Sequence, residues 1–143
     1  MEVIEIVELE ATNMHLVAGA GPEVFDNQVD ARQLEAFVKD PGHLMVLAIG
    51  AEGVVGFASG VMNFHPDKAP VLFLSEIGTV PERRRQGIAT RLAKALIALG
   101  KTKGCDGCWL ATELDNAAAR GLYKALGARE TRDIVVYDWD AEL

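Results

Sequence analysis

The chain has 143 residues, of which 50% are hydrophobic and 24% charged, so it is long enough for one globular domain with its own core and too short for two. Its net charge of −7 argues against a general nucleic-acid-binding protein, which needs a positive surface. No apolar run approaches the roughly 18 residues that cross a bilayer, and the acidic N-terminus does not resemble a signal peptide; we therefore expect a cytoplasmic single domain over residues 1–143 with no membrane partner.

Hydrophobic periodicity and turn residues predict ten elements of secondary structure. They are, in chain order, a strand in 3–9, helices in 12–20 and 29–40, strands in 43–50, 54–64 and 71–80, a helix from 88, a strand in 108–112, a helix in 115–127 and a last strand in 133–139. This order predicts an α/β (α+β) domain with mixed strand directions. The strand–helix–strand step from 71 to 112 can form a parallel pair through a right-handed crossover.

The turn before the longest predicted helix carries the main chemical signal. Apolar residues from Ile88 to Leu99 fall on one helical face, and the sequence ERRRQGIAT leads into that helix. Unpaired amides and the helix dipole favour an anion at such a turn, Gly87 lets the anion approach the backbone, and Arg84 and Arg85 add positive charge. A solvated basic turn is the alternative. The turn has neither three glycines of a dinucleotide fingerprint nor the Gly-Lys-Ser/Thr of a P-loop.

The two cysteines, Cys105 and Cys108, form a single C-x-x-C motif. Such a pair can be redox-active or half of a zinc site, but a structural zinc needs four ligands and no second pair exists. The three histidines are scattered along the chain. We therefore interpret the cysteines as two ordinary thiols, one in a turn and one opening a strand, and expect no metal.

Two motifs together resemble the GNAT superfamily of acetyl-CoA-dependent N-acetyltransferases. RRQGIA matches the pattern R/Q-x-x-G-x-G/A at Arg84, Gly87 and Ala89, where alanine replaces the commoner glycine. NAAARGLYKALGA matches the second motif at Asn116, Ala119, Tyr123 and Gly127. The order of elements also agrees along nearly the whole chain. The resemblance implies a mixed, mostly antiparallel sheet of six to seven strands with about four helices, in which the fourth and fifth strands are parallel and splayed.

The resemblance further implies a site for acetyl-CoA. Backbone amides of the first motif would surround the pyrophosphate, Ile77 and Thr79 would offer backbone groups to the pantetheine arm, and Tyr123 would protonate the leaving thiolate. The Ile77 N–H would stabilise the oxyanion. The residues expected to contact acetyl-CoA are Ile77, Gly78, Thr79, Arg84, Arg85, Gln86, Gly87, Ile88, Ala89, Thr90, Asn116, Ala119 and Tyr123. From its residue type alone, Tyr123 could equally be a half-buried core tyrosine.

Glu76 is the one carboxylate in an otherwise apolar strand, directly before Ile77. It either faces water at an edge or binds the acceptor ammonium and takes its proton. Acidic residues expected near the acceptor are Glu76, Glu113 and Asp115, and the terminal Asp138 and Asp140 are weaker candidates because terminal acids are often only solubilising groups. Such a lining suits a small polycationic amine.

More specifically, the chain looks like the GNAT-type aminoglycoside 3-N-acetyltransferases, on the basis of ERRRQGIAT, VFDNQVD, DPGHLMVLAIG and the ending YDWD. This resemblance implies direct acetyl transfer to an aminoglycoside and antibiotic resistance, and members of the superfamily commonly form homodimers. Two alternatives stay open. One is the same chemistry on a polyamine, a metabolite or a protein amine, and the other is a non-catalytic acyl-CoA-binding module.

Overall fold

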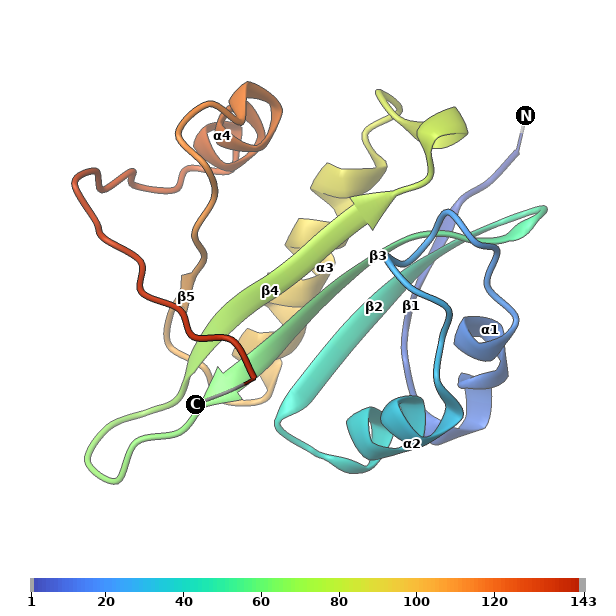
Figure 1. Ribbon diagram of the computed structural model, residues 1–143, viewed down its shortest axis with the longest axis horizontal. Coiled ribbons are helices and arrows are strands. Elements are labelled where there is room, and N and C mark those ends of the chain that lie inside the picture. The colour runs from blue at the N-terminus through green and yellow to red at the C-terminus, as the bar shows by residue number, and fades with distance from the viewer. Residues whose placement is uncertain (1, 142–143) are drawn as a thin grey trace. The chain divides into compact units, whose positions relative to one another are not determined.

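A computed structural model describes residues 2–141, which divide into two compact units. The first extends to Ala111 and the second begins at Thr112. The first unit contains a five-stranded sheet in the order β1-β2-β3-β4-β5 (Figure 1). Neighbouring strands are antiparallel, except that β4 and β5 are parallel. The GNAT-type mixed sheet is thereby confirmed, with five strands among the described residues rather than six or seven.

Most predicted elements occur with boundaries shifted by one or a few residues. The first unit contains β1 (Glu5–Glu8), the 3-10 helix η1 (Ala11–Asn13), α1 (His15–Ala18), α2 (Ala31–Lys39), β2 (His43–Gly50), β3 (Gly53–Asn63), β4 (Val71–Thr79), the 3-10 helix η2 (Pro81–Arg83), α3 (Ile88–Thr102) and β5 (Cys108–Trp109). The predicted helix in 12–20 forms only the short η1 and α1, and the predicted strand in 108–112 is reduced to two residues.

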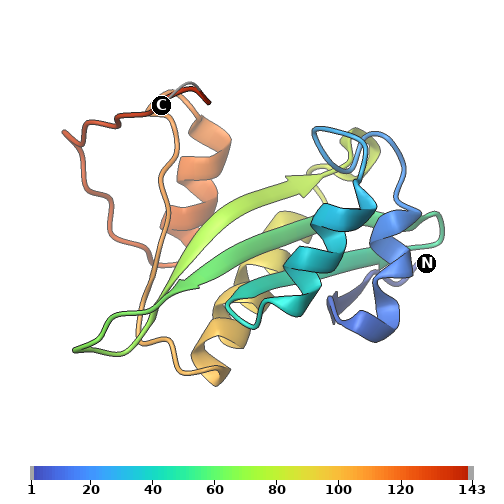
Figure 2. The ribbon, with the colours of Figure 1, turned by 60° about the horizontal axis from the view of Figure 1, so that its bottom comes forward.

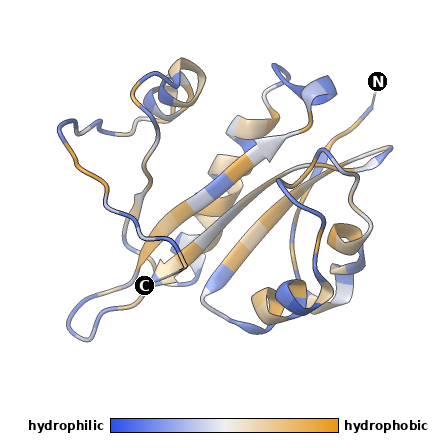
Figure 3. Ribbon diagram, viewed as in Figure 1, coloured by the Kyte–Doolittle hydropathy of each residue, from blue (hydrophilic) through white to orange (hydrophobic). Residues whose placement is uncertain are grey.

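The sheet is covered on both faces by helices. Figure 2 shows α1 and α2 on one face and α3 on the other. Burial on both faces explains why β2 and β3 are almost continuously apolar instead of alternating, as their colouring in Figure 3 shows. The most deeply buried large side chains come from the sheet and from α3: Leu47, Val55, Leu72, Leu92 and Leu96.

The two main helices of this unit follow from local sequence. Asp30 caps α2, because its Oδ1 accepts hydrogen bonds from the backbone N–H groups of Arg32 and Gln33 at 2.9 and 3.0 Å. The predicted apolar face of α3 is confirmed: Leu92 and Leu96 are fully buried against the sheet.

A β-bulge interrupts the pairing of β3 with β4. Ser59 pairs with Glu76 while the next residue of β3, Gly60, pairs with Leu74, so Ser75 is an extra residue on β4. A Cβ at Gly60 would lie 2.7 Å from the carbonyl oxygen of Phe73, so only glycine permits this close approach. An extra residue reverses the alternation of side chains, and β4 beyond Ser75 therefore presents the opposite set of side chains to each face.

The second unit contains one helix, α4 (Ala117–Ala125). It ends in a Schellman motif in which Gly127 has φ 85° and the N–H of Ala128 donates to the carbonyl of Tyr123 at 3.1 Å. The prediction of a strand in 133–139 was wrong: these residues have no regular secondary structure, and Tyr137 and Trp139 are 78% and 73% exposed. Alternating apolar residues favour a strand, but a strand forms only where a neighbouring strand satisfies its backbone groups.

Candidate functional site

The turn that leads into α3 has an unusual backbone conformation. Arg84 is extended, whereas Arg85 has φ 63° and Gly87 has φ 79° with ψ 7°, both in the left-handed region. Left-handed residues in a turn direct neighbouring N–H groups toward one concave side, the arrangement of an anion-binding nest. A Cβ built at Gly87 would meet no protein atom within 4 Å, so the space beside its backbone is open.

Six consecutive backbone amides at this turn have no hydrogen-bond acceptor in the described part of the chain. Arg84 donates to Pro81 and Arg91 donates to Gly87, but none of the amides of residues 85–90 between them donates. Unpaired N–H groups at the start of a 15-residue helix carry a partial positive charge. The turn is therefore suited to a multiply charged anion such as a diphosphate.

The three arginines of this turn have different roles in the structure. The Arg83 guanidinium forms ion pairs with Glu2 and with Glu52, the latter at 2.7 Å. The pKa of Glu2 is lowered by the hydrogen bond from the Ala51 N–H and then by Arg83, and Arg83 also lowers the pKa of Glu52. The two carboxylates in turn raise the pKa of Arg83. Arg84 donates from Nε to the Thr79 carbonyl at 3.4 Å, and Arg85 is exposed with no partner among residues 2–141. Arg85 is thus the arginine whose charge is not already neutralised or bonded.

The edge of β4 that faces away from β3 is mostly unpaired within the first unit. β5 pairs with β4 only at Leu72 and Phe73, which confirms the predicted splay of the parallel strands. The N–H of Val80 donates to the carbonyl of Val55 in β3 at 2.9 Å. Because successive N–H groups along a strand point to opposite edges, the N–H groups of Ile77 and Thr79 point toward the open edge. The backbone groups expected to bind an extended ligand therefore lie on a free strand edge.

Glu76 lines a cavity of about 270 Å³ on the face of the sheet that carries α1 and α2. The bulge at Ser75 explains why Glu76 points to this face. In a regular strand, Glu76 would share a face with the buried Leu74 two residues earlier, but the extra residue Ser75 turns Glu76 to the opposite face. The cavity is lined by Val17, Phe25, Asp26, Asn27, Val29, Asp30, Gln33, Leu34, Phe37, Met45 and Glu76. It combines three carboxylates with two amides and two aromatic rings, a lining suited to an amine.

Sequence reasoning missed the part of this cavity contributed by the loop between α1 and α2. Asp26 is exposed and has no partner among the described residues, whereas one oxygen of Asp30 already caps α2. The loop is held on the sheet by Phe25, whose ring centroid lies 4.5 Å from that of Phe57. The polar sequence FDNQ before a helix cap was the available signal, but nothing local indicated that it folds over Glu76.

The remaining predicted site residues belong to the second unit. Asn116 caps α4, and its Oδ1 accepts from the N–H of Ala119 at 3.1 Å. Tyr123 lies on α4 and is half-buried. Glu113, Asp115 and Asp138 are exposed. A bidentate ion pair between Arg120 and Glu130, joined by Arg132, lowers the pKa of Glu130 to about 2. For these residues the roles in catalysis and binding stay predictions.

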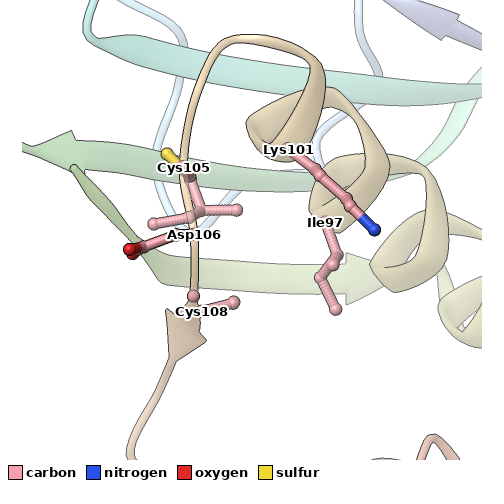
Figure 4. Close-up of a pocket in the computed structure, with 7 residues that line it drawn as sticks. Ile97, Lys101, Cys105, Asp106 and Cys108 are labelled. Atoms are coloured by element: carbon pink, nitrogen blue, oxygen red, sulfur yellow. The ribbon is translucent and has the colours of Figure 1, made fainter. Parts of the chain in front are cut away.

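A second cavity, of about 230 Å³, contains the cysteine pair (Figure 4). It lies between the end of α3 and β5, and Ile97 and Lys101 contribute from the helix. Burial raises the pKa of the Cys105 and Cys108 thiols, so both are protonated and poorly nucleophilic. Cys105 lies in the segment between α3 and β5, and Cys108 opens β5, as predicted. Residues 2–141 contain no cluster of three metal-ligating side chains.

No helix among the described residues is long and apolar enough to cross a membrane. The chain resembles the solved structure of AAC(6')-Iy in complex with a bisubstrate analogue, CoA-S-monomethyl-acetylneamine, with a TM-score of 0.79 at 23% identity over 97% of this chain and 99% of that one. It also resembles the aminoglycoside acetyltransferase meta-AAC0020, from an uncultured soil metagenomic sample, in complex with sisomicin, with a TM-score of 0.80 at 13% identity over 97% of both chains.

Curated relatives agree over shorter stretches. An aminoglycoside N(6')-acetyltransferase type 1 of Acinetobacter genomosp. 13 is 38% identical over 48% of this chain and 47% of its own length. A thialysine N-epsilon-acetyltransferase of Bos taurus is 35% identical over 54% of this chain and 45% of its own length. The chain thus spans about half the length of the curated relatives it matches. The model of the Acetyltransferase (GNAT) family matches residues 6–128, and the chain therefore belongs to the GNAT family of acetyltransferases.

Proposed function

We propose that this protein is an acetyl-CoA-dependent N-acetyltransferase. The observation that carries the proposal is the run of six unpaired backbone amides over residues 85–90 at the start of α3. The open space beside Gly87 and the unneutralised Arg85 fit the pyrophosphate of coenzyme A at this turn. The free edge of β4 beyond Phe73 fits the amide-rich pantetheine arm, which can pair with it as an added strand.

Acetyl-CoA supplies the acetyl group as a thioester, and each proposed step uses a residue of this chain. Glu76 binds the acceptor ammonium and removes its proton, directly or through a water. The N–H of Ile77 stabilises the negative charge that develops on the thioester oxygen. The amine nitrogen bonds to the acetyl carbon as the carbon–sulfur bond breaks, and Tyr123 donates its proton to the sulfur. The new amide nitrogen then releases its extra proton to water, and the Tyr123 oxygen regains a proton from water. Both thiols have raised pKa values, which favours direct transfer over an acyl-cysteine.

We propose an aminoglycoside as the acceptor. The cavity at Glu76 carries two further carboxylates, Asp26 and Asp30, and an aminoglycoside is a polycation with several amino groups. Relatives named as aminoglycoside N(6')-acetyltransferases support this class and favour the 6'-amino group. They give no support to the 3-N position expected from sequence. A diamino acid such as thialysine is the second candidate, because a relative named for it matches a similar share of the chain.

The test is release of free thiol from acetyl-CoA with wild-type protein and the Glu76→Gln variant. The acceptors are an aminoglycoside with a 6'-amino group, one with a 6'-hydroxyl group, thialysine and a peptide with a free N-terminus. We expect turnover with the 6'-amino aminoglycoside and a loss of about 10²-fold or more in kcat/KM for Glu76→Gln. Turnover with thialysine alone would replace the substrate class. Acetyl-CoA binding without turnover of any acceptor would indicate a binding module.

A further inference from the structure

Ser59 is the only polar side chain in the buried core of the described residues, with 6% of its surface exposed. It lies in the middle of β3, between Ala58 and Gly60, at the position where the bulge begins. Its neighbours on both adjacent strands are known from the register: Met45 of β2 is directly opposite on one side and Glu76 of β4 on the other.

The Ser59 side chain points to the face that carries the cavity of Glu76. Phe57, two residues earlier on the same strand, contacts Phe25 of the loop that closes this cavity, and residues two apart on a strand share a face. Met45 and Glu76, the two residues opposite Ser59, both line the cavity. Ser59 therefore lies beneath the cavity floor, between Met45 and Glu76.

The hydroxyl of Ser59 has no hydrogen-bond partner within residues 2–141. Buried hydroxyls in proteins are ordinarily bonded, so an unpartnered one beside a functional carboxylate needs a physical reason. Among the described side chains, Thr79 has the only oxygen that is fully enclosed and also lacks a hydrogen bond. The Ser59 oxygen lacks a hydrogen bond too, so it is not fully enclosed and still reaches solvent. Side chains directly opposite on neighbouring antiparallel strands have Cβ atoms about 4.5–5.5 Å apart, within reach of one bridging water.

We propose that Ser59 is a positioning residue for Glu76: its hydroxyl bonds to the Glu76 carboxylate through one water and directs that carboxylate at the acceptor ammonium. This proposal rests on the proposed function, in which Glu76 binds the acceptor. Glu76 is exposed and no ion pair holds it among the described residues, so without Ser59 its side chain would have no partner to fix its rotamer. The bulge therefore has two effects on Glu76. It turns the Glu76 side chain into the cavity, and it places Glu76 opposite Ser59, which carries the only core hydroxyl of the described chain.

The test is a double-mutant cycle measured by steady-state kinetics with acetyl-CoA and the best acceptor of the wild-type enzyme. We expect Ser59→Ala to lower kcat/KM for the amine about 10-fold, the effect of losing one hydrogen bond to a charged group, with KM for acetyl-CoA unchanged. Ser59→Thr keeps the hydroxyl and should recover most of the loss. In the Glu76→Gln background, Ser59→Ala should have little further effect.

Ser75→Ala is the matched control, because it removes an exposed serine hydroxyl from the same bulge and should leave both KM values as in the wild type. Thermal melting verifies that each variant is folded. The positioning role would be refuted if Ser59→Ala lowered kcat/KM for the amine equally in the wild-type and Glu76→Gln backgrounds. It would also be refuted if Ser59→Thr lowered kcat/KM as much as Ser59→Ala does. A wild-type enzyme with no turnover of any amine would refute the proposed function itself, and this proposal with it.

Discussion

Substitution of Gly87 separates the proposed anion-binding role of the turn from its contribution to stability. Gly87 is left-handed, at φ 79° and ψ 7°, and a Cβ added there meets no protein atom within 4 Å. Alanine in this region costs about 1–2 kcal/mol, partly offset by about 0.4–1 kcal/mol from the stiffer unfolded chain. The expected net loss is about 1 kcal/mol, which lowers Tm by about 2–4 °C in a protein of this size.

The expected effect on acetyl-CoA binding is larger than the effect on stability. A side chain at Gly87 occupies the open space beside the unpaired amides, so we expect at least one hydrogen bond to the diphosphate to be lost. A bond to a charged group contributes about 1.5–3 kcal/mol, which corresponds to roughly 10- to 100-fold in Kd. Asparagine tolerates the left-handed region better than alanine, so Gly87→Asn should weaken binding with a smaller change in Tm.

Gly104 provides the matched control for this prediction. It lies just beyond the other end of α3, has φ 106°, and a Cβ added there would likewise meet no protein atom within 4 Å. Gly104→Ala should therefore lower Tm without changing the affinity for acetyl-CoA. Isothermal titration with acetyl-CoA and thermal melting measure the two effects. Unchanged affinity in both Gly87 variants would refute the assignment of this turn as the diphosphate site.

Three further predictions concern catalysis, the arginines and pH. Tyr123→Phe should lower kcat by about 10²-fold or more with nearly unchanged acetyl-CoA affinity; a wild-type rate in a single-turnover assay would exclude the tyrosine as the acid. Arg83→Gln should lower Tm because its two carboxylates lose their partner, without weakening acetyl-CoA binding, whereas Arg85→Gln should weaken binding about 3- to 10-fold and leave Tm unchanged; the reverse pattern would contradict the division of roles. Glu130 has a pKa lowered from 4.5 to about 2, so its contribution to stability is present above pH 4.5 and is lost as the pH falls toward 2; the Tm difference between wild type and Glu130→Gln should shrink over that interval, and a constant difference would argue against the ion pair.

Local sequence determined the parts of this protein whose signals lie within a few residues of one another. The apolar periodicity of α2 and α3, the uninterrupted apolar strand β2 and the turn from Arg84 to Gly87 were predicted, because hydrophobic faces and turn residues are local properties of the sequence. The two GNAT motifs likewise predicted the family.

Only the tertiary structure decided which side chains meet at the cavity lined by Glu76. Glu76 enters it because one extra residue on β4 changes the register with β3, and Asp26 joins it because Phe25 packs on Phe57, far away in sequence. Arg83 could not be distinguished from Arg85 without the positions of Glu2 and Glu52. In each case the position of a side chain depends on a partner from a distant part of the chain. Residues 133–139 likewise form no strand because a strand requires a neighbouring strand to satisfy its backbone groups. A sequence pattern indicates which secondary structure a segment can adopt, and packing against a distant partner determines which one it adopts.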